Sequence, residues 1–186
     1  MRPSKRTDIL NATLRVIDNN GVTAVTFDSV AEEAGLSKGG LLYHFPSREA
    51  LLKALHEHLA AQWESALIDA AGKPADKATA TERSAAYAQV ATQSATRAEL
   101  LLILETANEP DMSAPFDAVM TRWATPVPAT DQLSPTELVE HITRLAADGL
   151  WLDGALSNPT LSRSARQQIS EYLADLARLL PTTERE

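Results

Sequence analysis

The sequence predicts an all-α protein of about nine helices. Apolar residues recur at spacings of three and four, as in Leu10, Leu14 and Ile17, which places them on one face of a helix. Ser or Thr residues that can cap a helix precede these stretches, and Gly or Pro residues follow many of them. Residues 22–27 are too short and too closely flanked by polar residues to predict a strand.

Four helices are expected in the first part of the chain. Thr26 caps the short second helix, which ends at Gly35, where a left-handed turn is cheapest for glycine. Ser37 caps a third helix of about two turns, and Pro46 stops it. The expected ranges are residues 5–20, 27–34, 38–45 and 48–71.

Five more helices follow a loop at residues 72–76. Thr81 is the expected cap of the first of them. The next contains the five consecutive apolar residues Leu100–Leu104, which predicts a helix buried on most sides. Ser134, with Pro135 at the first helical position and Glu137 three residues on, forms a capping box. The expected ranges are residues 82–95, 97–108, 113–124, 135–156 and 163–180.

Composition excludes several classes of protein. A chain of 186 residues makes one compact domain, or one large and one small domain. It has no Cys, which excludes disulfides, Cys-ligated zinc, iron–sulfur clusters and thiol nucleophiles. Its longest run of large apolar residues is far too short to span a membrane, and no signal-peptide apolar segment follows the basic start. We therefore expect a cytoplasmic protein.

The charges divide unevenly along the chain. The net charge is −8, yet residues 1–60 hold seven Lys or Arg and seven Asp or Glu, and the rest carries the whole deficit. Such asymmetry suggests different partners for the two parts. An acidic body repels phosphate, so we expect any contact with DNA to lie in the N-terminal quarter of the chain.

Residues 26–45 have the outline of a helix-turn-helix: two short helices, Gly35 in the turn, and Ser37 as cap of the second helix. Gly39 and Gly40 stand near the start of that second helix, where each lowers helix stability by about 1 kcal/mol relative to Ala. We interpret them as residues that let the backbone approach a phosphate chain or a base.

The run of residues 35–52 resembles the signature of the tetracycline-repressor (TetR) family. The family pattern is Gly-Val/Leu-Ser-x-Gly-x-x-Tyr-x-His-Phe-x-x-Lys/Arg-x-x-Leu. Here Leu42 stands in place of one aromatic residue, and Tyr43 directly precedes His44. The resemblance covers roughly residues 4–60.

This resemblance implies a ligand-responsive transcriptional regulator, most simply a repressor, that binds a pseudo-palindromic operator as a homodimer. A small aromatic, cationic or apolar effector would release it. The expected domains are a helix-turn-helix DNA-binding domain over residues 1–46 and a ligand-binding and dimerisation domain over residues 47–186, with the helix at 47–71 as connection. The expected partners are double-stranded DNA, the effector and a second copy of the chain, with no cofactor, metal or membrane.

The resemblance also places the third helix in the major groove. Lys38 is the expected reader of guanine O6 and N7, and Ser37 with the first backbone N–H groups would hold a phosphate. Tyr43, His44 and Arg48 would contact the sugar–phosphate backbone, which positions the protein without reading sequence. The expected DNA contacts are Lys5, Thr26, Ser37, Lys38, Gly39, Gly40, Leu41, Tyr43, His44 and Arg48.

Each of these assignments has a structural alternative. Lys38 and Lys5 could be solvated surface charges, and Tyr43 could belong to the core, as we expect for Phe45. His44 could bond a carbonyl at its own helix end.

The acidic body contains the aromatic and Met side chains that a ligand pocket needs. Phe116, Met120 and Trp123 are spaced to share one helix face, although a plain core would explain each of them as well. Glu105 would place a carboxylate on a mostly interior helix, where it favours a cationic aromatic ligand. Asp148 has Arg144 one turn earlier as a structural partner. The expected ligand contacts are Trp63, Leu100, Leu104, Glu105, Asn108, Phe116, Met120, Trp123, Asp148 and Trp151.

The last two helices are the expected dimer interface, as the family resemblance implies. A glycine inside a helix, such as Gly149, lowers stability unless another backbone comes close to it. Packing within one subunit is the alternative for the apolar positions. The expected interface residues are Leu138, Ile142, Leu145, Gly149, Leu152, Ile169, Leu173 and Leu176.

Two other functions are alternatives to a transcriptional regulator. An enzyme is disfavoured because residues 56–58 read His-Glu-His, and side chains two apart on a helix do not share a metal. The sequence also contains no Gly-rich phosphate loop or nucleophile elbow. A helical protein-interaction module that does not bind DNA is the remaining alternative.

Overall fold

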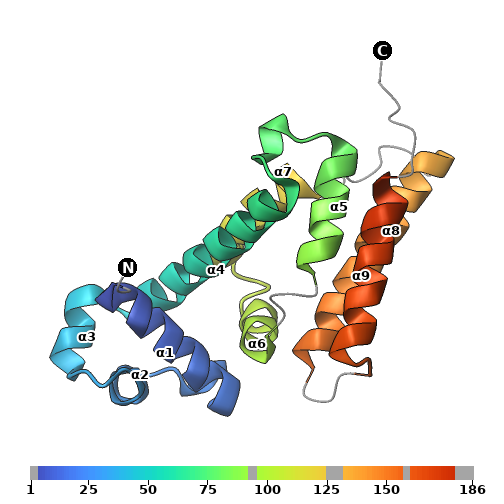
Figure 1. The fold of residues 1–186 in the computed structure, drawn as a ribbon. Helices are drawn as coiled ribbons and strands as arrows, with labels where there is room; N and C mark the ends of the chain where they lie inside the picture. Colours follow the sequence, from blue (N-terminus) through green and yellow to red (C-terminus); the bar gives the residue numbers. More distant parts are fainter. Residues whose placement is uncertain (1–3, 92–95, 125–131, 157–159, 179–186) are drawn as a thin grey trace. The chain divides into compact units, whose positions relative to one another are not determined.

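The computed structural model describes residues 4–91, 96–124, 132–156 and 160–178. Within these ranges it contains nine α-helices, two short 3₁₀ helices and no strand, so the all-α prediction is confirmed (Figure 1). The α-helices are α1 (Lys5–Asn20), α2 (Phe27–Ala34), α3 (Lys38–His44), α4 (Arg48–Ala71), α5 (Ala80–Val90), α6 (Arg97–Glu105), α7 (Pro110–Trp123), α8 (Pro135–Ala155) and α9 (Arg163–Arg178). The 3₁₀ helices are η1 (Val22–Ala24) and η2 (Ala75–Lys77).

Capping residues set most helix starts where the sequence predicts them. The Ser134 Oγ accepts from the Glu137 amide, and the Glu137 carboxylate accepts from the Ser134 amide at 2.9 Å, which confirms the predicted capping box of α8. For α5 the predicted cap, Thr81, is wrong. The cap is Thr79, because Glu82 reaches back to its amide at 2.8 Å and closes a second capping box. Residues 92–95, predicted to end this helix, lie outside the described residues.

Helices α6 and α7 also differ from the predicted ranges. Helix α6 ends at Glu105, before the predicted end at Asn108, and α7 begins at Pro110, before the predicted start at Ser113. A proline fits the first turn of a helix, since the amide it lacks has no intrahelical partner there. No helix within the described ranges is long and apolar enough to cross a membrane.

Contacts divide the chain into two compact units, one within residues 1–61 and 96–117, the other within residues 62–95 and 118–186. Helices α4 and α7 contribute to both. The predicted division at residue 46 separates DNA binding from ligand binding; it concerns function and stays a prediction.

The first unit packs α1, α2, α3, the first half of α4 and α6 around one apolar core. Ile9 and Ile17 of α1, Leu41 of α3 and Leu55 of α4 are fully buried in it. The Arg97 guanidinium donates to the Asp18 carbonyl, which joins the start of α6 to the end of α1. The helix-turn-helix therefore shares one apolar core with α1, α4 and α6.

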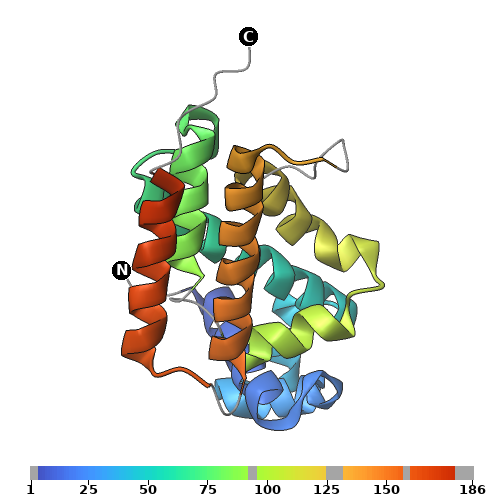
Figure 2. The same ribbon diagram turned by 90° about the vertical axis from the view of Figure 1, so that its right-hand side faces the viewer.

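The second unit is built around α5, α8 and α9, which lie side by side in Figure 2. Alanines make the contact between α5 and α9 close: Ala85, Ala88, Ala174 and Ala177 are all buried. The Ser170 hydroxyl donates to the Ala88 carbonyl at 2.8 Å, so even the polar atom at this contact is satisfied.

Candidate functional site

Helices α2 and α3 form the predicted helix-turn-helix. Thr26 and Ser29 close a capping box at the start of α2, with the Ser29 amide donating to the Thr26 Oγ1 at 3.1 Å. Gly35 ends α2 with φ +65°, a left-handed conformation that side chains rarely adopt. The Leu36 amide then donates to the Ala31 carbonyl at 2.9 Å and closes the turn. Sequence thus determines both the start of α2 and the turn that directs α3.

The start of α3 presents an open surface. Ser37 caps the helix by accepting from the Gly40 amide at 3.1 Å, and Lys38 beside it is exposed. A Cβ added at Gly39 would meet nothing within 4 Å, so the protein itself does not need glycine there. The predicted close approach of DNA to this backbone stays a prediction.

Leu41 does not lie on that surface. Its side chain is 0% exposed and belongs to the core of the first unit. Its assignment as a DNA contact is therefore wrong. The reason is helical spacing: Leu41 and Phe45 are one turn apart on the same face, and Phe45 is buried as predicted.

The outer face of α3 instead carries Leu42 and Tyr43, whose side chains are 43% and 86% exposed. Tyr43 contacts His44 edge to face, with ring centroids 5.3 Å apart. Exposure on this scale excludes the core alternative for Tyr43. Leu42 is not among the DNA contacts expected from the sequence, although it stands where the family pattern has an aromatic residue and lies next to the buried Leu41.

Arg48 has a structural role in this unit. Its Nε donates to the Val25 carbonyl and its Nη2 to the Val22 carbonyl, both at 2.9 Å, which ties α4 to η1. Its predicted phosphate contact stays a prediction. Thr26 and Lys5 are exposed, and the Arg6 guanidinium lies 5.0 Å from the centre of the Phe45 ring.

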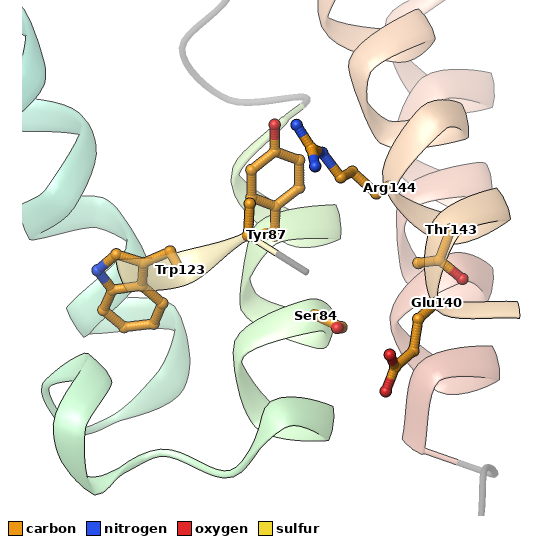
Figure 3. A pocket seen from close by; sticks show the side chains of 7 residues that line it. Ser84, Tyr87, Trp123, Glu140, Thr143 and Arg144 are labelled. Carbon is orange, nitrogen blue, oxygen red and sulfur yellow. The ribbon is translucent and has the colours of Figure 1, made fainter. Parts of the chain in front are cut away.

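The second unit contains a small pocket between α5, the end of α7 and α8 (Figure 3). Its empty space is about 200 Å³, part of it open to solvent. The lining residues are Ser84, Tyr87, Trp123, Ala124, Glu140, Thr143 and Arg144. Among these, only Trp123 was predicted. The others come from helices distant in sequence, and no local pattern marks them.

Tyr87 is the centre of the polar network beside this pocket. Its hydroxyl donates to Asp148 at 2.5 Å, and Arg144 pairs with the same carboxylate at 3.8 Å. Burial, followed by the Asp148 carboxylate, raises the pKa of the Tyr87 hydroxyl. Asp148 thus has the predicted partner Arg144, and a second partner that the sequence does not indicate.

Two further polar groups, the Glu140 carboxylate and the Thr143 hydroxyl, lie at the pocket. Among the described residues, no hydrogen bond or ion pair reaches the half-buried carboxylate of Glu140. The buried Thr143 hydroxyl also has no hydrogen-bond partner in the described part of the chain. Because Arg144 is paired with Asp148, the unpaired charge at the pocket is negative.

Predicted aromatic residues line or support this network. Trp63 stacks edge to face on Tyr87 with ring centroids 5.6 Å apart, and Met120 lies 3.8 Å from the Tyr87 hydroxyl. Trp123 is almost fully buried, and its Nε1 donates to Glu64, which also forms a two-bond pair with Arg122. The Arg122 hydrogen bonds are the main cause that lowers the pKa of Glu64. Trp151 is half-buried on α8.

The prediction that Glu105 is an interior carboxylate is wrong. Glu105 and Asn108 are exposed, and Leu104 is 64% exposed. Helix α6 buries only Ala98 and Leu102, one turn apart, so a run of five apolar residues does not make the helix interior. Leu100 and Phe116 are half-buried and belong, with Glu105, to the first unit rather than to the one that holds the pocket.

An apolar stripe covers the outer face of α8. Leu138, Ile142, Leu145 and Leu152 are between 45% and 69% exposed and follow a spacing of four and three residues. Gly149 stands in the same stripe, and a Cβ there would meet nothing within 4 Å. On α9, Ile169 is exposed and Leu176 is half-buried. Leu173 is buried within its own chain, so its assignment to an interface is wrong.

Comparison with known proteins identifies the family. Residues 9–55 match the family model for bacterial regulatory proteins of the tetR family, and residues 81–178 match the tetracycline repressor-like C-terminal domain. The chain belongs to the TetR family. It is thus a transcriptional regulator of the ligand-responsive repressor type, and not an enzyme.

Relatives that match over most of both chains support this assignment. The chain is 27% identical to the HTH-type transcriptional regulator BetI of Burkholderia thailandensis, over 95% of this chain and 94% of the relative. It is 29% identical to BetI of Paraburkholderia phymatum over the same shares.

Solved structures share the fold. A TetR-family transcriptional regulator from Rhodococcus sp. superposes with a TM-score of 0.67 at 19% identity, covering 93% of this chain and 98% of that one. The multidrug binding protein EbrR in complex with malachite green superposes with a TM-score of 0.58 at 18% identity, covering 92% and 98%.

Proposed function

We propose that this TetR-family regulator binds a pseudo-palindromic operator as a homodimer, with α3 of each subunit in the major groove, and leaves it when a cationic aromatic effector binds. The exposed face of α3 supports the proposed binding to DNA. Lys38, Gly39 and Tyr43 are exposed there, and the buried Leu41 and Phe45 hold the helix in place. The other proposed DNA contacts are Lys5, Thr26, Ser37, Gly40, His44 and Arg48.

The operator is the first test. Lys38→Ala is expected to lower the ratio of operator to non-specific affinity by about 10- to 100-fold, since one good base contact is worth about 1–3 kcal/mol. Fluorescence anisotropy with an operator selected from randomised duplexes, against a scrambled duplex, measures this ratio. A wild-type protein that treats all duplexes alike would disprove operator binding and favour the protein-interaction alternative.

The apolar stripe of α8 supports the homodimer. Leucines at a spacing of four and three form a coiled-coil seam when a second helix packs on them. Gly149 lies on this stripe and gives room for a partner backbone. Two copies of the seam, with Ile169 and Leu176 of α9 beside it, would make an interface with two-fold symmetry. Half-sites about 34–36 Å apart then set the spacing that the two α3 helices must match.

The unpaired carboxylate of Glu140 supports a cationic effector. Tyr87 and Trp123 lie at the same pocket and offer aromatic surface to a cation. Pockets for drug-sized ligands measure about 300–1000 Å³, so a dye has to enlarge this one. That enlargement would move Trp63 and Glu64 of α4, the helix that carries residues of both units. An effector that favours the enlarged state shifts the protein away from the DNA-binding state.

Glu140→Gln tests the class of effector. Malachite green is a cationic dye that EbrR binds. The affinity of the Glu140→Gln variant for this dye is expected to be about 10-fold lower than that of the wild type, because one charge-assisted contact of about 1.4 kcal/mol is removed. Binding of the neutral dye Nile red should not change. Tryptophan quenching measures both affinities. Glu105→Gln is the matched control, since this carboxylate is exposed and lies in the other unit. Equal losses in the two variants would remove Glu140 from the site.

A further inference from the structure

We propose that Asp28 sets the sequence specificity of this regulator as a positioning residue for Lys38, an inference that rests on the proposed function. Lys38 is the first residue of α3, and Asp28 lies in the first turn of α2. The Lys38 Nζ is 2.9 Å from the Asp28 Oδ2. The two side chains are 56% and 74% exposed, so this ion pair lies on the surface that α2 and α3 present to solvent.

Folding does not explain the pair. An exposed ion pair stabilises a protein by about 0–1 kcal/mol, and much of that is screened by salt. The start of α2 already has its capping box between Thr26 and Ser29, and the turn depends on Gly35. The main effect of the Lys38–Asp28 ion pair is therefore electrostatic, and it acts on any molecule that approaches α3.

The charges around Lys38 are unusual for a surface that meets DNA. Lys38 is the only Lys or Arg in α2 and α3, which together hold three carboxylates. Glu33 is paired with Arg15 of α1 at 2.5 Å, whereas Glu32 is exposed. Attraction between cationic side chains and phosphates supplies most non-specific affinity for DNA. This surface therefore attracts an arbitrary duplex only weakly.

The geometry gives the pair a specific use. An ammonium group has three N–H donors, and one of them is directed at Asp28. The other two match guanine O6 and N7, the commonest acceptors for Lys in the major groove. Asp28 holds the ammonium at the start of α3 and repels phosphate oxygens from it. Lys38 then contributes to the reading of bases and adds little to general attraction for the backbone.

Asp28→Asn tests the proposal, because it removes the charge and keeps a similar shape. Affinity for a scrambled duplex is expected to rise about 10-fold, and the slope of log affinity against log salt to steepen by about 1, as one phosphate contact is gained. The preference for a selected operator over the scrambled duplex is expected to fall about 10-fold. Fluorescence anisotropy at several KCl concentrations measures all three quantities, and thermal unfolding verifies that the variant is folded.

Glu32→Gln is the matched control. Glu32 is an exposed carboxylate on the same helix, and within the described residues no hydrogen bond or ion pair reaches its side chain. Equal effects of Asp28→Asn and Glu32→Gln would mean that only net charge matters, and would overturn the proposal. So would an undiminished effect of Asp28→Asn in a Lys38→Ala background, where nothing remains to be positioned. A wild-type protein without any operator preference would instead overturn the proposed function, and this inference with it.

Discussion

Leu145→Glu is expected to give a folded monomer that has lost tight operator binding. Leu145 is the most exposed leucine of the α8 stripe, at 69%, so a glutamate is well solvated in the isolated chain. In a dimer the same carboxylate would be buried against the partner's apolar stripe without a counter-charge, which is strongly unfavourable. The substitution therefore acts on association and leaves the fold of the subunit intact.

Loss of the dimer has a large effect on DNA binding. Two linked recognition helices bind two half-sites about 10²- to 10⁴-fold more tightly than one helix binds one half-site. Operator affinity should fall by that factor, while affinity for a single half-site should stay the same. Sedimentation velocity gives the oligomeric state, and anisotropy with full and half operators gives the affinities.

Leu104→Glu is the matched control for this prediction. Leu104 is 64% exposed on α6, and the substitution makes the same chemical change on a helix of the first unit. It should leave the variant in the same oligomeric state as the wild type. A Leu145→Glu protein that still sediments as a dimer would place the interface on another surface.

Sequence predicts most helices here because their ends depend on single nearby residues. Ser37 caps α3 and Gly35 turns the chain before it, and both act through contacts within three or four residues. The capping box at Ser134 is equally local. Such contacts are visible in a sequence because the partners are neighbours in it.

The pocket could not be predicted in the same way. Tyr87, Trp123 and Glu140 come from three helices, and their meeting depends on how α5, α7 and α8 pack. The prediction for Glu105 was wrong for a related reason. Its helix buries one narrow line of residues, and which line is buried depends on the neighbours and not on the apolar run itself.

Leu41 and Leu42 show the same limit within one helix, and they provide the second large prediction. The sequence predicts an outward position for Leu41, yet Leu41 is 0% exposed, and its neighbour Leu42 is 43% exposed. Leu41→Ala is expected to lower the free energy of unfolding by about 2–5 kcal/mol, the range for a leucine removed from a closed core. Leu42→Ala should change it by less than about 0.5 kcal/mol.

Urea denaturation followed by circular dichroism distinguishes the two variants. A lower midpoint at an unchanged slope would mean that Leu41→Ala reduces stability without altering the surface exposed on unfolding. The DNA readout should show the opposite order. Leu42→Ala should weaken operator binding in a protein of wild-type stability, because its side chain lies beside Tyr43 on the outer face of α3. Equal and small losses of stability in both variants would instead return Leu41 to the DNA-binding surface, and α3 would have to be rotated about its axis.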